Sequence, residues 1–173
     1  MPATECAAEK ETQHHLGAAH GYGPVQSEEH VIFAVFEETP REGNRLRPTA
    51  FPARQLRRDE FSLARLDHLT RRDFEQRVVA PLSEEHGPLV GIARAQVGAL
   101  RDLHYLFEDK LSRAVCVTDT VTAEDHDSHA ALGYSESQEV LSDKQKQKIR
   151  ATIHADLTDT FGDLVGIADV FDP

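Results

Sequence analysis

The chain has few of the features that mark an exported or membrane-embedded protein. It contains no apolar run of about 18 residues, the length that a transmembrane helix needs. The N-terminal stretch has neither a basic start nor an apolar core, so we expect no secretory signal. Only two cysteines are present. Because Cys6 lies in a polar segment and Cys116 in an apolar run, a disulfide between them is not expected. These absences predict a cytoplasmic protein with no membrane partner.

The short motifs of common enzyme classes are also missing. The sequence has no GxSxG, no GxxxxGKS/T, no GxGxxG and no CxxC, which removes the usual signatures of serine hydrolases, nucleotide-binding loops and dithiol chemistry. Tryptophan is absent, and only three tyrosines and eight phenylalanines occur in 173 residues. Aromatic stacking platforms for single-stranded nucleic acid are therefore not expected.

Charge is abundant and unevenly distributed. The net charge is −11, which opposes binding to a phosphate backbone. The segment from Arg41 to Arg77, however, contains ten arginines, no lysine and six acidic residues. This basic segment favours an anion-binding or partner-binding surface, and it is the one place where nucleic acid contact is conceivable. Internal pairing of the arginines with the acidic remainder is the alternative. The candidate anion-binding residues are Arg47, Arg54 and Arg65.

The residue pattern predicts one domain of mixed α and β structure. Residues 1–28 are polar and without period, and we expect them to form a flexible tail before a single domain at 29–173. Apolar β-type runs predict strands, and apolar residues spaced four apart after an N-cap serine or threonine predict helices. The expected strands are His30–Glu37, Phe61–Arg65, Leu89–Ala93, Arg113–Thr118 and Ala130–Tyr134. The expected helices are Thr70 to about Leu82, Gln96–Tyr105 and a long helix over 143–161, while Arg47–Leu56 is expected to be irregular or extended with Phe51 in the core.

Interleaved short strands and few long helices indicate an α+β fold. We expect a small mixed β-sheet packed on one face by two or three helices, of which 143–161 is the longest. No glycine-rich turn follows a strand, so a doubly wound parallel fold is not expected.

The segment between the last two predicted strands concentrates acidic and imidazole side chains. Asp119 ends a strand, and Asp125, His126, Asp127 and His129 follow. Carboxylates and imidazoles at a strand end suit a divalent metal such as Mn, Fe or Zn, and the candidate ligands are Asp119, Asp125, Asp127 and His129. A second hypothesis needs no metal. In it, His129 is a general base positioned by Asp119, with His126 as an alternative base and Arg47 or Arg65 as the anion clamp. An ordinary solvated loop would show the same composition.

Two functional hypotheses from different classes follow. The first is an accessory protein that acts through a protein partner, because no catalytic signature is present and the charge asymmetry is strong. The alternative is a small metal-dependent hydrolase of the phosphoesterase or nuclease class that uses the loop at 119–129. A third class, a binder of anionic small molecules, requires Arg47, Arg54 and Arg65 to converge. The sequence leaves open whether the protein is an enzyme.

Overall fold

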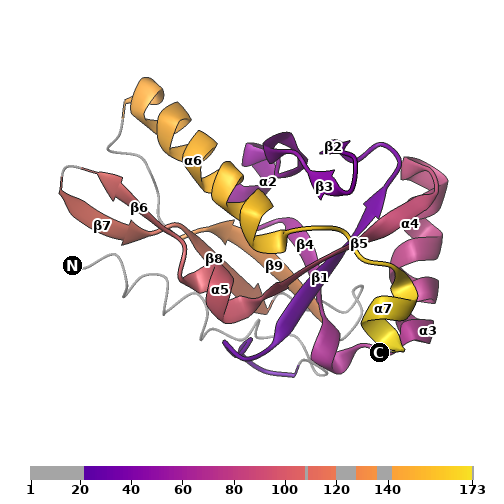
Figure 1. Cartoon of the computed structure of the whole chain (residues 1–173). Helices are drawn as coiled ribbons and strands as arrows, with labels where there is room; N and C mark the ends of the chain where they lie inside the picture. The colour runs from indigo at the N-terminus through magenta and orange to yellow at the C-terminus, as the bar shows by residue number, and fades with distance from the viewer. Residues whose placement is uncertain (1–21, 108, 120–127, 136–141, 173) are drawn as a thin grey trace.

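A five-stranded antiparallel sheet organises the chain (Figure 1). The computed structural model describes residues 22–107, 109–119, 128–135 and 142–172. The strand order is β5-β1-β4-β9-β8, and every neighbouring pair is antiparallel. The α+β class is confirmed. The strands are β1 (His30–Phe36), β4 (Phe61–Arg65), β5 (Leu89–Gln96), β8 (Val115–Asp119) and β9 (His129–Tyr134).

The longest helix, α6 (Asp143–Phe161), covers one face of the sheet and confirms the prediction for this segment. Ser142 caps its first turn, and a capping box with Gln145 completes the start. An apolar stripe at four-residue spacing faces the core and includes Ile149, Ile153 and Leu157. Because the cap and the stripe are both local features, the sequence was sufficient to place this helix.

The opposite face is covered as well, although helices were expected on one face only. A helical stretch runs from Arg71 to His86, and together with the C-terminal helix α7 (Ile167–Phe171) it packs on the second face (Figure 1). Phe74 is fully buried there against Ile32. Strand β1 has apolar side chains on both faces of the sheet, so both faces are buried under helices. The stretch comprises α3 (Arg71–Asp73), a π-helical turn (Phe74–Val79) and α4 (Ala80–His86).

This helix was expected to end near Leu82, but it continues past Pro81. The helix continues to His86 because the chain widens into a π-helical turn just before the proline, where the Ala80 N–H donates to the Glu75 carbonyl. The wider turn relieves the clash that a proline ring makes with the preceding turn. The helix ends at Gly87, whose φ is 79°.

The remaining elements are short, and two expectations are corrected there. The helix expected over Gln96–Tyr105 is only α5 (Val97–Arg101), because His104 already begins the β6 strand. Within the irregular segment, Phe51 is in the core as predicted, but a short helix, α2 (Ala53–Arg57), follows it. The other elements are β2 (Arg41–Glu42), β3 (Arg45–Leu46), the 3-10 turns Pro48–Ala50 and Leu66–His68, β6 (His104–Phe107) and β7 (Lys110–Arg113).

Residues 22–28, the described part of the expected tail, lie against the domain. Val25 is 2% exposed, and its carbonyl accepts a hydrogen bond from Arg101 at 2.7 Å. None of the helices within the described ranges is long and apolar enough to cross a membrane.

Candidate ligand-binding cleft

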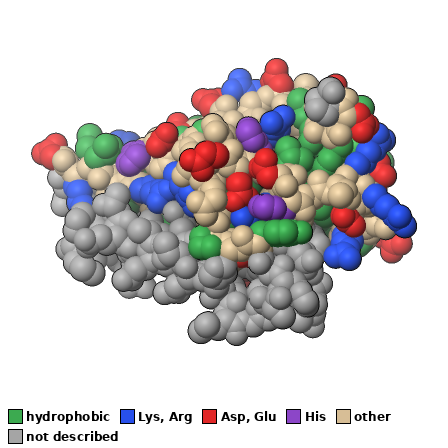
Figure 2. Space-filling view, turned by 90° about the horizontal axis from the view of Figure 1, so that it is seen from below, with side chains coloured by type: hydrophobic (Ala, Val, Ile, Leu, Met, Phe, Trp, Pro, Cys, Tyr) green, Lys and Arg blue, Asp and Glu red, His purple; other side chains and the backbone are tan. Residues whose placement is uncertain are grey.

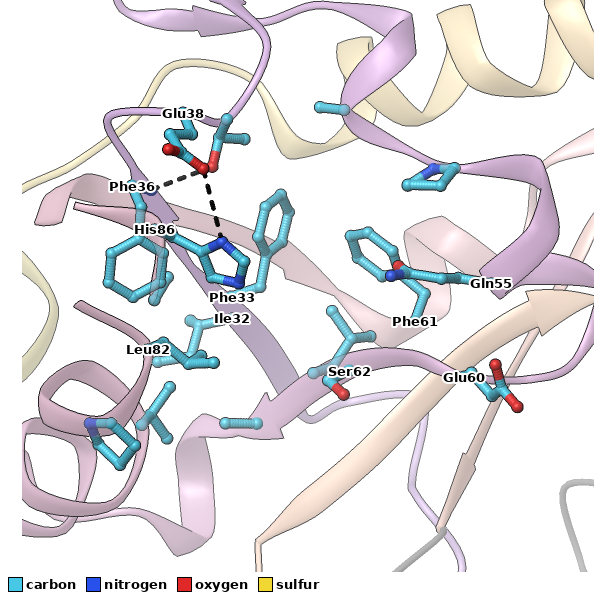
Figure 3. Close-up of a pocket in the computed structure, with 18 of the residues that line it drawn as sticks. Ile32, Phe33, Phe36, Glu38, Gln55, Glu60, Phe61, Ser62, Leu82 and His86 are labelled. Carbon is cyan, nitrogen blue, oxygen red and sulfur yellow. Dashed lines mark hydrogen bonds and ion pairs between the residues drawn. The ribbon is translucent and has the colours of Figure 1, made fainter. Parts of the chain in front are cut away.

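The sheet opens between its two central strands. Strands β1 and β4 pair at only two positions, Val31 with Arg65 and Ile32 with Ala64. Continued in the same register, the next equivalent pair would join Ala34 to Ser62. The strands separate instead, and a cavity of about 620 Å³ lies between them (Figure 3). This volume is in the range of small-molecule binding sites.

Backbone hydrogen-bonding groups point into this cleft. The Arg65 N–H donates to the Ser128 carbonyl at 2.7 Å, on the β9 side of β4. Because a strand directs its backbone groups alternately to its two neighbours, Ala64 and then Ser62 direct theirs toward β1. On β1, Ile32 pairs with Ala64 and directs its backbone groups toward β4. Two residues later, the backbone groups of Ala34 point in the same direction, into the cleft. Ala34 and Ser62 thus aim N–H and C=O groups at the same space.

The walls are mainly apolar on both faces of the sheet. On the α6 side, the rings of Phe33 and Phe61 meet edge to face with centroids 5.2 Å apart. On the other side, the helical stretch contributes Val78, Pro81 and Leu82. Figure 3 shows the labelled Phe33, Phe61 and Leu82 arranged around the opening. A ligand in the cleft therefore meets apolar surface above and below the plane of the sheet.

Charged and amide side chains line the opening of the cleft. The Glu38 carboxylate lies 3.8 Å from Nδ1 of His86, the last residue of α4, and both residues line the cavity (Figure 3). Gln55 and Glu60 stand at the opposite side of the opening, and Arg77 also lines it. A few polar groups around an apolar interior are typical of a site that orients a ligand.

Of the predicted catalytic pair, His129 lines this cavity and Asp119 lies elsewhere. Asp119 pairs with Ala130 across the sheet, so strand alternation places its side chain on the face opposite to that of His129. Its carboxylate is 3.8 Å from Nη1 of Arg65, and both side chains are buried. Asp119 therefore takes part in a buried ion cluster.

Arg65 is the centre of that cluster. Its Nε and Nη2 donate to the two Glu29 oxygens at 2.8 and 2.6 Å, and Nη1 donates to the Gly23 carbonyl at 2.6 Å. Burial disfavours ionised Glu29, but hydrogen bonds from Arg65 and the Gln26 N–H, with the nearby positive charges, hold its pKa below the ordinary value. Arg65 thus holds β4 to the segment before β1.

The structure does not gather the three predicted anion-binding arginines. Arg65 is buried at the end of β4, whereas Arg54 is exposed on α2 near the start of that strand. Arg47 is exposed and lies 3.7 Å from Glu42. Pairing with acids is common in the basic segment. It includes Arg45 with Asp159 at 2.7 Å and Arg71 with Glu75 at 3.0 Å. Figure 2 shows basic and acidic side chains interspersed on the face seen from below.

The predicted metal site cannot be assembled from the described residues. Asp125, Asp127 and His126 lie outside them, so the ligand set Asp119, Asp125, Asp127 and His129 stays a prediction. Within the parts of the chain that the structure describes, no three His, Cys, Asp or Glu side chains form a group suited to a metal ion.

Apart from His129, sequence reasoning did not identify the residues of the cleft. Glu38, Gln55 and His86 come from three separate segments, and no motif or spacing connects them. Their association depends on the separation of β1 from β4, which leaves no local signal.

Comparisons with protein-family models, with curated proteins and with solved structures find no match for this chain.

Proposed function

We propose that this protein is an interaction protein whose β1–β4 cleft binds an extended, mainly apolar segment of a partner protein. The observation that carries the proposal is the opposed placement of Ala34 and Ser62, which would pair in a continuous sheet but face a cavity instead. This is a binding function and requires no catalytic group.

The backbone of the cleft suits an extended peptide. Strand edges that offer N–H and C=O groups bind added strands by the hydrogen bonds of an ordinary sheet. Because β1 and β4 run antiparallel, a segment between them is antiparallel to one and parallel to the other. The partner thus completes the open part of the sheet.

The walls define the preferred side chains. Successive side chains of an extended segment point to opposite faces of the sheet. One set meets Phe33 and Phe61, and the other meets Val78 and Leu82. Both sets are therefore expected to be apolar, with polar residues at the end that reaches Glu38 and His86.

Selection of short random peptides against the full chain tests the proposal. Binding of each selected peptide is measured by calorimetry with wild type, with Ser62→Phe, which fills the cleft, and with Gln96→Phe. The latter places the same ring at an exposed strand position outside the cavity. We expect apolar peptides whose affinity falls about tenfold or more in Ser62→Phe, a loss of about 1.4 kcal/mol, and is unchanged in Gln96→Phe.

Amide hydrogen exchange gives a readout that does not depend on the variants. Peptide binding to wild type should slow exchange at the Ala34 and Ser62 amides, because both would then donate to the peptide backbone. Peptides that bind Ser62→Phe as tightly as wild type would overturn the proposal. So would a selection that yields no peptide protecting these two amides.

A further inference from the structure

A second concave surface lies between α2 and α6, away from the cleft. It encloses about 510 Å³ and is lined by Lys146, Arg150 and His154 of α6, together with Ala53 of α2. The three α6 residues are spaced four apart, which places them along one face of the helix. Arg57 follows Ala53 by four positions on α2 and so shares its side of that helix. Arg57 is not among the lining residues, but its charge acts on Tyr134, which contacts His154, so cations from both helices lie near the groove.

His154 lines the groove, and its ring contacts the buried Tyr134 behind it. The Tyr134 hydroxyl oxygen lies 2.7 Å from Nε2 of His154, and their rings are nearly parallel, with an interplanar angle of 4°. The Arg150 guanidinium carbon stands 5.8 Å from the Tyr134 ring centroid. Burial, with the Arg150 charge adding to it, lowers the pKa of His154, so the imidazole is neutral near pH 7. When the Tyr134 O–H donates to Nε2, Nδ1 carries the proton and can donate in turn.

We propose that this α2–α6 groove binds a phosphate group through Arg57, Lys146, Arg150 and His154. A phosphate monoester carries close to two negative charges at neutral pH and has three acceptor oxygens. Two guanidiniums, an ammonium and an imidazole N–H match that charge and that number of acceptors. Among the described residues that line the groove, Asp143 is the one acid, against the two cations Lys146 and Arg150.

This site differs from the anion site expected from Arg47, Arg54 and Arg65, and it does not depend on the β1–β4 cleft. The ligand chemistry is a phosphate group, whether free or in a small phosphomonoester. A monovalent carboxylate of similar size is expected to bind more weakly, because it offers less charge and fewer acceptor oxygens.

Calorimetric titration of the full chain tests the proposal with inorganic phosphate, phosphoserine and acetate as the probes. Phosphate and phosphoserine should bind, and acetate should bind at least about tenfold more weakly. If phosphoserine binds more tightly than inorganic phosphate, the source is a phosphomonoester, and the reverse order indicates free phosphate. Absence of binding by both phosphate probes would overturn the proposal.

The variants Arg57→Gln and Arg150→Gln locate the site, and Lys148→Gln is the matched control. Lys148 is an exposed cation of α6 outside the groove lining. Phosphate affinity should fall about tenfold in each groove variant and stay within about twofold in Lys148→Gln. The NMR resonances of the His154 ring in the wild-type protein should shift as phosphate is added. This measurement does not depend on the folding of any variant. Equal loss in all three variants, or unmoved His154 resonances, would contradict the assignment.

Discussion

Arg65 and Glu29 form a two-pronged ion pair between the chain that precedes β1 and the end of β4. Nε and Nη2 of Arg65 reach the two oxygens of Glu29 at 2.8 and 2.6 Å, and the side chains are only 1% and 9% exposed. Removing one partner of a buried pair leaves the other charged and without compensation. This geometry makes the pair a determinant of stability.

We expect Glu29→Gln to lower the free energy of unfolding by about 3 kcal/mol, because Arg65 stays buried with less neutralising charge. Asp159→Asn is the matched control, since it breaks the exposed ion pair with Arg45. Exposed pairs contribute about 0–1 kcal/mol. Urea unfolding monitored by circular dichroism measures both changes. Equal effects of the two substitutions would show that the Arg65 cluster is not a stabilising element.

Lowering the pH should decrease the free energy of unfolding through the Glu29 carboxylate. The folded state holds the pKa of Glu29 below its ordinary value, so the unfolded chain takes up the proton first. The stabilisation is present above the unfolded pKa of about 4.3 and is lost as the pH falls through the lower folded pKa. Urea midpoints recorded below pH 5 should therefore decline more steeply for wild type than for Glu29→Gln. Parallel curves would refute the linkage.

Raising the pH into the alkaline range should also decrease the free energy of unfolding, through Tyr134. Burial raises the pKa of Tyr134 to about 12, although the charges of Arg150 and Arg57 oppose the shift. An unfolded tyrosine ionises near pH 10, so the folded state loses stability as the pH rises from about 10 to 12. In Tyr134→Phe this contribution to the pH slope should disappear. Tyr22→Phe changes an exposed tyrosine and should retain the wild-type slope in the same unfolding measurement.

The packing of α6 gives a further stability prediction. Ile153 is fully buried at the middle of the apolar stripe, so Ile153→Ala should cost about 2–5 kcal/mol by creating a cavity. The neighbouring Thr152 is exposed on the same helix, and Thr152→Ala should change stability by about 0.5 kcal/mol or less. Urea midpoints of the two variants test whether this face anchors the helix to the sheet.

Local patterns predicted the elements with strong local signals. Ser142 at the cap and the stripe through Ile153 were enough to place α6. Continuous apolar and β-branched residues were enough for β1. The helix end expected near Leu82 was wrong, because a π-helical turn before Pro81 lets the helix continue to His86. Rules based on neighbouring residues in the sequence do not predict this wider turn.

The candidate sites depended on contacts that sequence patterns do not encode. Arg65 has the composition of an anion clamp, yet its burial beside Glu29 and Asp119 makes it a structural cation. Asp119 ends β8 and His129 begins β9, but strand alternation places their side chains on opposite faces of the sheet. The cleft residues Ala34 and Ser62 look like ordinary strand positions in the sequence.

The sequence by itself determined the α+β class, the main strands and the long helix, because periodicity and capping act over a few neighbouring residues. Only the tertiary structure decided which face each charged side chain occupies and where β1 departs from β4. Those outcomes arise from pairing between segments distant in the chain, where burial and strand register determine which groups meet. The cleft and the α2–α6 groove both result from such contacts between distant segments.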